Sequence, residues 1–170
     1  MAVTLDGPIP AQRNFIDGEW VACATGRTYE RRSPYDQSVV GIYQDSDERD
    51  AQRAIDAARR AFDSGPWPRM PAAERAAVFR RAAGLLRQRS DELATIMTRE
   101  VGQPKLEQAK FVAGAADTLE YYANLIVTRR DEAVYGQHPH AVGIIAKEPV
   151  GVVGTLTAWH TPLSVAHKSC

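Results

Sequence analysis

The chain has 170 residues, of which 44% are hydrophobic, and it carries 21 basic and 21 acidic side chains. This length suits one moderate domain or an incomplete piece of a larger protein, and the charge balance gives no overall field that would attract nucleic acid or an anionic membrane. No apolar run in the sequence approaches the roughly 20 residues that span a bilayer, and the N-terminus lacks the basic and apolar regions of a secretory signal. We therefore expect a soluble, cytoplasmic protein without nucleic-acid or membrane partners.

The sequence does not predict a metal site. It contains two cysteines, Cys23 and Cys170, and neither belongs to a CxxC pair. Its four histidines are scattered without the spacing of zinc ligands.

The first part of the chain predicts an extended arm and then a small antiparallel sheet. Residues 1–13 are interrupted by glycine and proline, and we expect them to form the arm ahead of a domain at residues 14–170. Asp17 and Gly18 stand between β-forming residues, which is a strong short-range signal for a hairpin. A short strand is predicted over residues 39–43, after a turn rich in Ser, Pro and Asp.

The middle of the chain predicts three helical segments. Asp45, with Glu48 three residues later, fits a capping box at the start of the first. Pro71 suits the first turn of the second helical segment, and we expect this segment to bend near Ser90. The third helical segment covers about 105–127. Apolar residues recur at helical spacing in all three segments. In the first segment they are Ala51, Ile55, Ala58 and Phe62. In the other two they are the expected buried stripes, which are Val78, Ala82, Leu85, Leu86, Leu93, Ile96 and Met97 in the second and Phe111, Ala115, Leu119, Tyr122 and Ile126 in the third.

From Ala141 the pattern changes to a sequence rich in Val and Ile and interrupted by Gly. It predicts two strands with a bend at Glu148 and Pro149. The second strand is apolar throughout, as is typical of a buried strand in a parallel sheet. A turn beginning at Trp159 and His160 follows it.

Several segments resemble the NAD(P)-dependent aldehyde dehydrogenase superfamily. EPVGVVGTLTAWHTPL is similar to that family's EPxGVxGxIxPWNxP motif, and FIDGEWV is similar to its N-terminal hairpin. Glu100, Gly102 and Pro104 resemble its Glu-x-Gly-x-Pro corner. The pieces follow the family's order from Asn14 to Lys168, so the chain is identified as similar to the N-terminal portion of a member of this superfamily.

The resemblance implies an α/β fold. Residues 14–170 would form an incomplete domain, the N-terminal part of a Rossmann-like cofactor domain, with a small N-terminal antiparallel sheet, long helices and the first parallel strand. Residues 141–149 would form part of the oligomerisation hairpin. We expect the family's cofactor, NAD or NADP, but binding by this chain alone is doubtful, because the groups that hold ribose and phosphate have no counterpart in the sequence.

The resemblance also implies chemistry. In the family a Cys thiolate attacks the aldehyde, an Asn side chain and a backbone N–H hold the oxyanion, hydride passes to the nicotinamide, and a Glu activates water. The backbone of Leu156, Thr157, Ala158 and Trp159 would lie along the cofactor, and His160 stands at the position of the Asn. An imidazole donates one hydrogen bond with a different reach from an amide, so His160 either partly replaces the Asn or is an ordinary turn residue.

The family's nucleophilic Cys motif and general-base Glu have no counterpart in the sequence. Cys170 follows Lys168 and Ser169 in the first helix after the turn, where the family has a packing residue, and Cys23 lies in the hairpin region. One hypothesis is therefore a truncated aldehyde dehydrogenase, which is an oxidoreductase by descent but inactive alone, that is, a pseudoenzyme. It would act on an aldehyde substrate only if the natural chain is longer. The alternative is a non-catalytic module that forms a homo- or hetero-oligomer through residues 141–150, because exposed strand edges pair readily.

Overall fold

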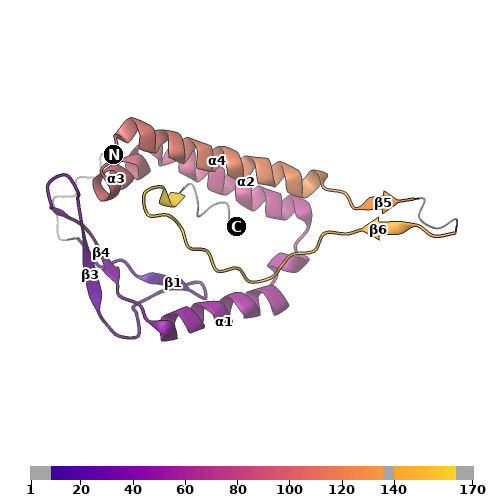
Figure 1. Cartoon of the computed structure of the whole chain (residues 1–170), viewed down its shortest axis with the longest axis horizontal. Coiled ribbons are helices and arrows are strands. Elements are labelled where there is room, and N and C mark those ends of the chain that lie inside the picture. Colours follow the sequence, from indigo (N-terminus) through magenta and orange to yellow (C-terminus); the bar gives the residue numbers. More distant parts are fainter. Residues whose placement is uncertain (1–8, 136–139, 164–170) are drawn as a thin grey trace.

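The computed structural model describes residues 9–135 and 140–163 (Figure 1). In chain order its elements are β1 (Asn14–Ile16), β2 (Glu19–Val21), β3 (Thr28–Arg32), β4 (Val39–Gln44), α1 (Glu48–Ser64), the 3-10 helix η1 (Trp67–Arg69), α2 (Ala72–Gln88), α3 (Ser90–Val101), α4 (Lys105–Thr128), β5 (Glu132–Val134) and β6 (Gly143–Ile145). The strands of this described part form three two-stranded sheets, β1–β2, β3–β4 and β5–β6, each antiparallel. The predicted mixed α/β class with a small N-terminal antiparallel sheet and long helices is confirmed.

The predicted hairpin at Asp17 and Gly18 is present. Both residues have positive φ, 56° and 82°, as the two central residues of a type I′ turn require. The described end of the predicted arm is extended and pairs with β4, since Ala11 forms a parallel bridge with Ile42, and the Gln12 N–H donates to the Ile42 carbonyl at 2.7 Å. Residues 1–8 of the arm lie outside the described residues.

Helix α1 begins two residues later than the capping prediction placed it. Asp47 is the N-cap, and its carboxylate accepts the Arg49 N–H at 3.0 Å. The predicted cap, Asp45, instead forms an ion pair with Arg27 at 3.0 Å. Asp47 prevails because it directly precedes the first helical residue, where a side-chain oxygen reaches the unpaired N–H groups of the first turn. The apolar repeat of α1 is largely exposed, and the buried residues of the helix are Asp50 and Ala57.

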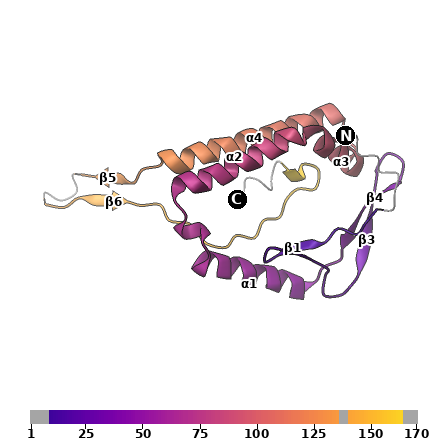
Figure 2. The same cartoon turned by 180° about the vertical axis from the view of Figure 1, so that it is seen from behind.

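Helices α2 and α4 pack side by side and antiparallel (Figures 1 and 2). Arg87 pairs with Asp117 and Glu120, whereas Arg80 donates to Asn124. The chain divides at Arg89 into α2 and α3, so the predicted bend is confirmed. Buried side chains on these three helices are mostly small, which lets the backbones approach closely, and they are Ala76, Ala83, Ala94, Met97, Val101, Gln108, Val112, Ala115, Ala116, Leu119 and Ala123.

Two members of the predicted buried stripes are wrong. Leu85 is 57% exposed, and Tyr122 is 38% exposed. The helix-contacting face of α2 includes the predicted Ala82 and Leu86, and it also includes Ala83. Apolar residues on two sides of α2 satisfy the same helical period, so spacing alone could not decide which side packs on α4.

The C-terminal part of the described chain differs most from the prediction. Strands β5 and β6 form a hairpin that projects from the helices, and residues 146–158 then return between α1 and the α2–α4 pair in both views (Figures 1 and 2). The predicted parallel strand is wrong for the described chain, since residues 149–157 are extended but form no strand, and Val150 and Leu156 are 90% and 101% exposed. A strand needs a neighbouring backbone to bond with, and the described residues place none beside this segment. None of the helices in the described residues could cross a membrane, since none combines the necessary length with low enough polarity.

Candidate functional site

The predicted site residues lie on one continuous stretch that ends in a tight turn. Leu156 and Thr157 are exposed on the extended segment, and the Thr161 N–H approaches the Ala158 carbonyl at 3.4 Å, which closes a turn with Trp159 and His160 at its centre. The Trp159 and His160 rings meet edge to face with centroids 6.3 Å apart. The structure therefore presents the imidazole at the tip of an exposed turn, directly after an open backbone.

The backbone before this turn is available to a ligand or to another strand. Among the described residues, 150–157 make no backbone–backbone hydrogen bond. Their N–H and C=O groups are strong polar groups that require partners whenever they are buried. The segment thus offers backbone donors and acceptors, and it has no charged side chain for a phosphate between Val150 and Trp159.

Behind the turn lies a cluster that the sequence prediction did not include. The Arg31 guanidinium stands over the Trp159 ring, with Cζ 5.1 Å from the centroid, and its Nη2 donates to the Glu100 carbonyl at 2.9 Å. The Tyr43 hydroxyl donates to the Glu100 carboxylate. Burial, and then the hydrogen bond and negative charge of Glu100, raise the pKa of Tyr43 well above its ordinary value of 10.0, so the phenol stays a donor throughout the physiological range. No motif marks Arg31 or Tyr43, because their importance depends on contacts with residues far away in the chain.

The Glu-x-Gly-x-Pro corner joins this cluster to the end of α3. Gly102 has φ 82° and caps α3, with its N–H on the Thr98 carbonyl at 2.8 Å. A Cβ at Gly102 would lie 2.6 Å from Cγ of Pro34. The corner therefore uses glycine both for its left-handed backbone and for the close approach of the β3–β4 loop.

Cys23 does not join the turn. Cys23 is buried, and its Sγ donates to the Arg27 carbonyl at 3.1 Å and lies 3.3 Å from Oγ1 of Thr25. Cys23 thus packs inside the loop between β2 and β3. Cys170 lies outside the described residues. Within residues 9–135 and 140–163, no three His, Cys, Asp or Glu side chains gather as metal ligands would.

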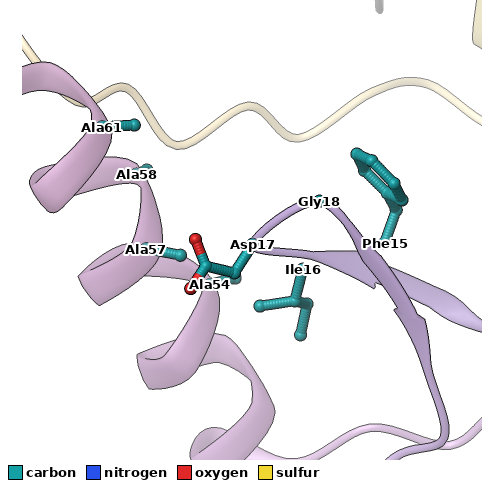
Figure 3. A pocket seen from close by; sticks show the side chains of 8 residues that line it. All are labelled: Phe15, Ile16, Asp17, Gly18, Ala54, Ala57, Ala58 and Ala61. Carbon is teal, nitrogen blue, oxygen red and sulfur yellow. The ribbon is translucent and has the colours of Figure 1, made fainter. Parts of the chain in front are cut away.

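A separate groove lies between α1 and the β1–β2 hairpin (Figure 3). Its volume is about 330 Å³, and the residues that line it are Phe15, Ile16, Asp17, Gly18, Ala54, Ala57, Ala58 and Ala61. The alanine side chains of α1 point toward the hairpin, and the Asp17 carboxylate at its rim pairs with Arg60 at 2.9 Å. The groove is thus an apolar surface with a neutralised charge, and it carries no catalytic group. The i, i+3, i+4, i+7 spacing of the alanines was the signal in the sequence that could have located it.

Comparison with known proteins gives a consistent result over almost the whole chain. The sequence profile of the aldehyde dehydrogenase family matches residues 20–170. An α-ketoglutarate semialdehyde dehydrogenase of Haloferax volcanii is 37% identical over 154 residues, which are 90% of this chain and 32% of that protein. A betaine aldehyde dehydrogenase of Bacillus subtilis is 32% identical over 153 residues, which are 90% of this chain and 31% of that protein. The chain thus spans about a third of the length of these relatives.

Solved structures agree in fold as well as in sequence. A crystal structure of an NAD-dependent aldehyde dehydrogenase from Sinorhizobium meliloti matches 95% of this chain with a TM-score of 0.88 and 34% identity, over 32% of that chain. An indole-3-acetaldehyde dehydrogenase of P. syringae in complex with NAD⁺ also matches 95% of this chain, with a TM-score of 0.87 and 38% identity, over 32% of that chain. The fold is therefore that of the N-terminal part of aldehyde dehydrogenase structures, and this chain belongs to the aldehyde dehydrogenase family.

Proposed function

We propose that this chain takes part in the NAD(P)-dependent oxidation of an aldehyde to an acid, within an assembly that supplies the nucleophile and the general base. The observation that carries the proposal is the exposed turn at Trp159 and His160 at the end of an open backbone segment. The bound NAD⁺ of the P. syringae relative supports a dinucleotide as cofactor. The cofactor supplies the hydride acceptor when it is bound.

The residues of this chain would bind and orient. The backbone of Leu156 through Trp159 would form hydrogen bonds along the cofactor. His160 would donate one N–H toward the oxyanion that develops on the aldehyde oxygen, because a fixed donor aimed at developing charge lowers the barrier. In its neutral form the imidazole has one such N–H, and its exposed position lets it turn toward a substrate.

The isolated chain is proposed to be inactive, because it contains neither the family's Cys motif nor its general-base Glu. A direct test measures aldehyde-dependent NADH and NADPH formation by the purified 170-residue chain and by a chimera. The chimera joins this chain to the remaining two thirds of the Haloferax volcanii relative, with that remaining part alone as the control. We expect turnover from the chimera and none from either piece, whereas turnover by the 170-residue chain itself would refute the proposed inactivity.

His160 has its own test in the same chimera. His160→Asn restores the amide donor that the family has at this position, so turnover should rise by as much as about 10²–10³-fold if the imidazole is a poor substitute. Thr161→Ser, a conservative change at the next residue of the turn, is the matched control. Equal turnover of the His160→Asn variant and its parent would remove His160 from the mechanism.

A second candidate function is a non-catalytic interaction module, and the projecting β5–β6 hairpin favours it. Val142, Ile144 and Ile145 are 58%, 72% and 50% exposed on this hairpin, and a two-stranded sheet has free backbone on both outer edges. Its partner would be a second copy of the chain or a full-length relative. Light scattering should show an oligomer that Ile144→Lys dissociates and that Ile55→Lys, an exposed change on α1, leaves intact. A monomer at every concentration, and no binding to a full-length relative, would contradict this function.

A further inference from the structure

The side chain of Arg31 on the β3–β4 hairpin contacts the Trp159–His160 turn. Among the residues of β3, Arg31 is half-buried while the others are exposed. Its guanidinium donates to the Glu100 carbonyl at 2.9 Å and at the same time stands 5.1 Å from the centre of the Trp159 ring. A guanidinium at this distance from an indole face is attracted by the negative charge of the ring's π system.

Arg31 itself is held by a rigid frame. Its backbone pairs with Gly41 across the sheet, and the register shifts immediately afterwards, between Arg31 and Arg32. A Cβ at Gly41 would lie 2.5 Å from Cε2 of Tyr43, so glycine leaves room for the Tyr43 ring to fold back over the strand. The Tyr43 hydroxyl then donates to the carboxylate of Glu100, whose carbonyl accepts Arg31. The end of α3 thus holds the guanidinium through the Glu100 carbonyl, and Tyr43 of β4 in turn bonds the Glu100 side chain.

The turn itself, by contrast, makes few backbone hydrogen bonds among the described residues. Its closing hydrogen bond is long, 3.4 Å, and the Trp159 side chain is 61% exposed. The described segment before it makes no backbone–backbone hydrogen bond from 150 to 157. A turn with so few bonds of its own takes its position from whatever contacts its side chains.

We propose that Arg31 is a positioning residue, which sets the place of the Trp159–His160 turn relative to the β3–β4 hairpin and α3. The effect of Arg31 on activity rests on the proposed function, because a displaced turn would misdirect the His160 donor. The contact of Arg31 with Trp159 does not depend on that function, since both residues belong to this chain.

The test uses the full 170-residue chain with Trp20→Phe and Trp67→Phe, so that Trp159 is the sole tryptophan, and it is excited where the six tyrosines do not absorb. Arg31→Met keeps the apolar stem and removes the guanidinium. Arg32→Met is the matched control, because Arg32 is the exposed neighbour that pairs with Glu30 and donates to the Gln37 carbonyl. Acrylamide quenching of Trp159 should rise in Arg31→Met toward the value of the urea-unfolded chain. Arg31→Lys, which retains the positive charge, should lie between, and Arg32→Met should match the parent.

A double-mutant cycle measures the contact directly. Arg31→Met and Trp159→Leu, alone and together, should show a coupling of about 2- to 5-fold in the folding equilibrium constant. Unchanged quenching in Arg31→Met, or no coupling in the cycle, would overturn the proposal. If Arg31→Met does not fold, the comparison of Arg31→Lys with the parent decides in the same way.

The two proposals can fail separately. Quenching and coupling need neither cofactor nor aldehyde, so they report on Arg31 even if the chimera has no turnover. In an active chimera, Arg31→Met should lower turnover and Arg32→Met should not. If the double-mutant cycle shows the coupling but Arg31→Met leaves turnover of the chimera unchanged, the contact is real, but its role in positioning the site is wrong.

Discussion

At the scale of single residues, Asp50 stands out as a buried carboxylate. It is 2% exposed in the first turn of α1, and both carboxylate oxygens accept the Ala24 N–H, at 3.1 and 2.9 Å. Arg53 lies 3.5 Å away on the same helix. A buried carboxylate is stable only with such partners, and the N-terminus of a helix favours negative charge. Asp50 therefore fastens the loop after β2 to α1.

Asp50→Ala should lower the free energy of unfolding by about 1–2 kcal/mol, because the Ala24 N–H loses its partner. Ala24 is exposed, so water can replace part of that hydrogen bond and keep the loss moderate. Asp56→Ala is the matched control, since Asp56 is an exposed residue of the same helix that accepts a hydrogen bond from Gln52 at 2.8 Å. Urea unfolding followed by tryptophan fluorescence measures both. Equal midpoints for the two variants would contradict the role of Asp50 as a fastener.

At the scale of elements, two glycines show how backbone conformation decides the effect of the same substitution. Gly18 has φ 82° in the β1–β2 turn, whereas Gly84 lies within α2, and a Cβ on either would meet nothing within 4 Å. Steric contact therefore does not distinguish the two substitutions to alanine. They differ in backbone conformation, which is left-handed at Gly18 and helical at Gly84.

We expect Gly18→Ala to destabilise the chain by about 1–2 kcal/mol, the cost of a left-handed conformation for a residue with a Cβ. Gly84→Ala should stabilise it by about 0.5–1 kcal/mol, because alanine loses less backbone entropy in a helix. Thermal unfolding by circular dichroism checks both signs. A loss of stability in Gly84→Ala would mean that α2 is packed more closely there than the structure has it.

At the scale of the whole molecule, the described part of the chain leaves much apolar surface open. Val150, Val153 and Leu156 on the extended segment are 90%, 59% and 101% exposed. Exposed apolar stretches with unpaired backbone bind other surfaces or aggregate. The segment thus has the composition of a buried strand and the surroundings of a surface loop.

Leu156→Asp should reduce both the binding of a hydrophobic dye and aggregation without lowering the urea midpoint, because the Leu156 side chain contributes nothing to the core. Leu119→Asp is the opposite case, since Leu119 is 6% exposed in the α2–α4 core, and an unpaired buried charge should abolish cooperative unfolding. Dye fluorescence, light scattering and urea titration of the two variants make the comparison. A fall in midpoint for Leu156→Asp would show that the segment is covered in solution.

The sequence by itself determined the elements that short-range chemistry controls and the family to which the chain belongs. Asp17 and Gly18 specified their turn, Pro71 lies just before the first residue of α2, and Gly102 gave the end of α3, because backbone freedom at these positions is a property of the residue. The motif around Trp159, together with the hairpin and corner segments in the family's order, identified the family without any structure. It also located the turn that carries His160.

Only the tertiary structure decided what depends on neighbours distant in the chain. Ala83 rather than Leu85 faces α4, because either side of α2 satisfies the helical period and only packing chooses between them. The Val-rich segment is open rather than a strand, since strand formation needs a second backbone that composition cannot supply. Arg31 lies over Trp159 because the β3–β4 hairpin and α3 bring it there, and a cation–π contact between residues so far apart in the chain leaves no periodic signal in the sequence.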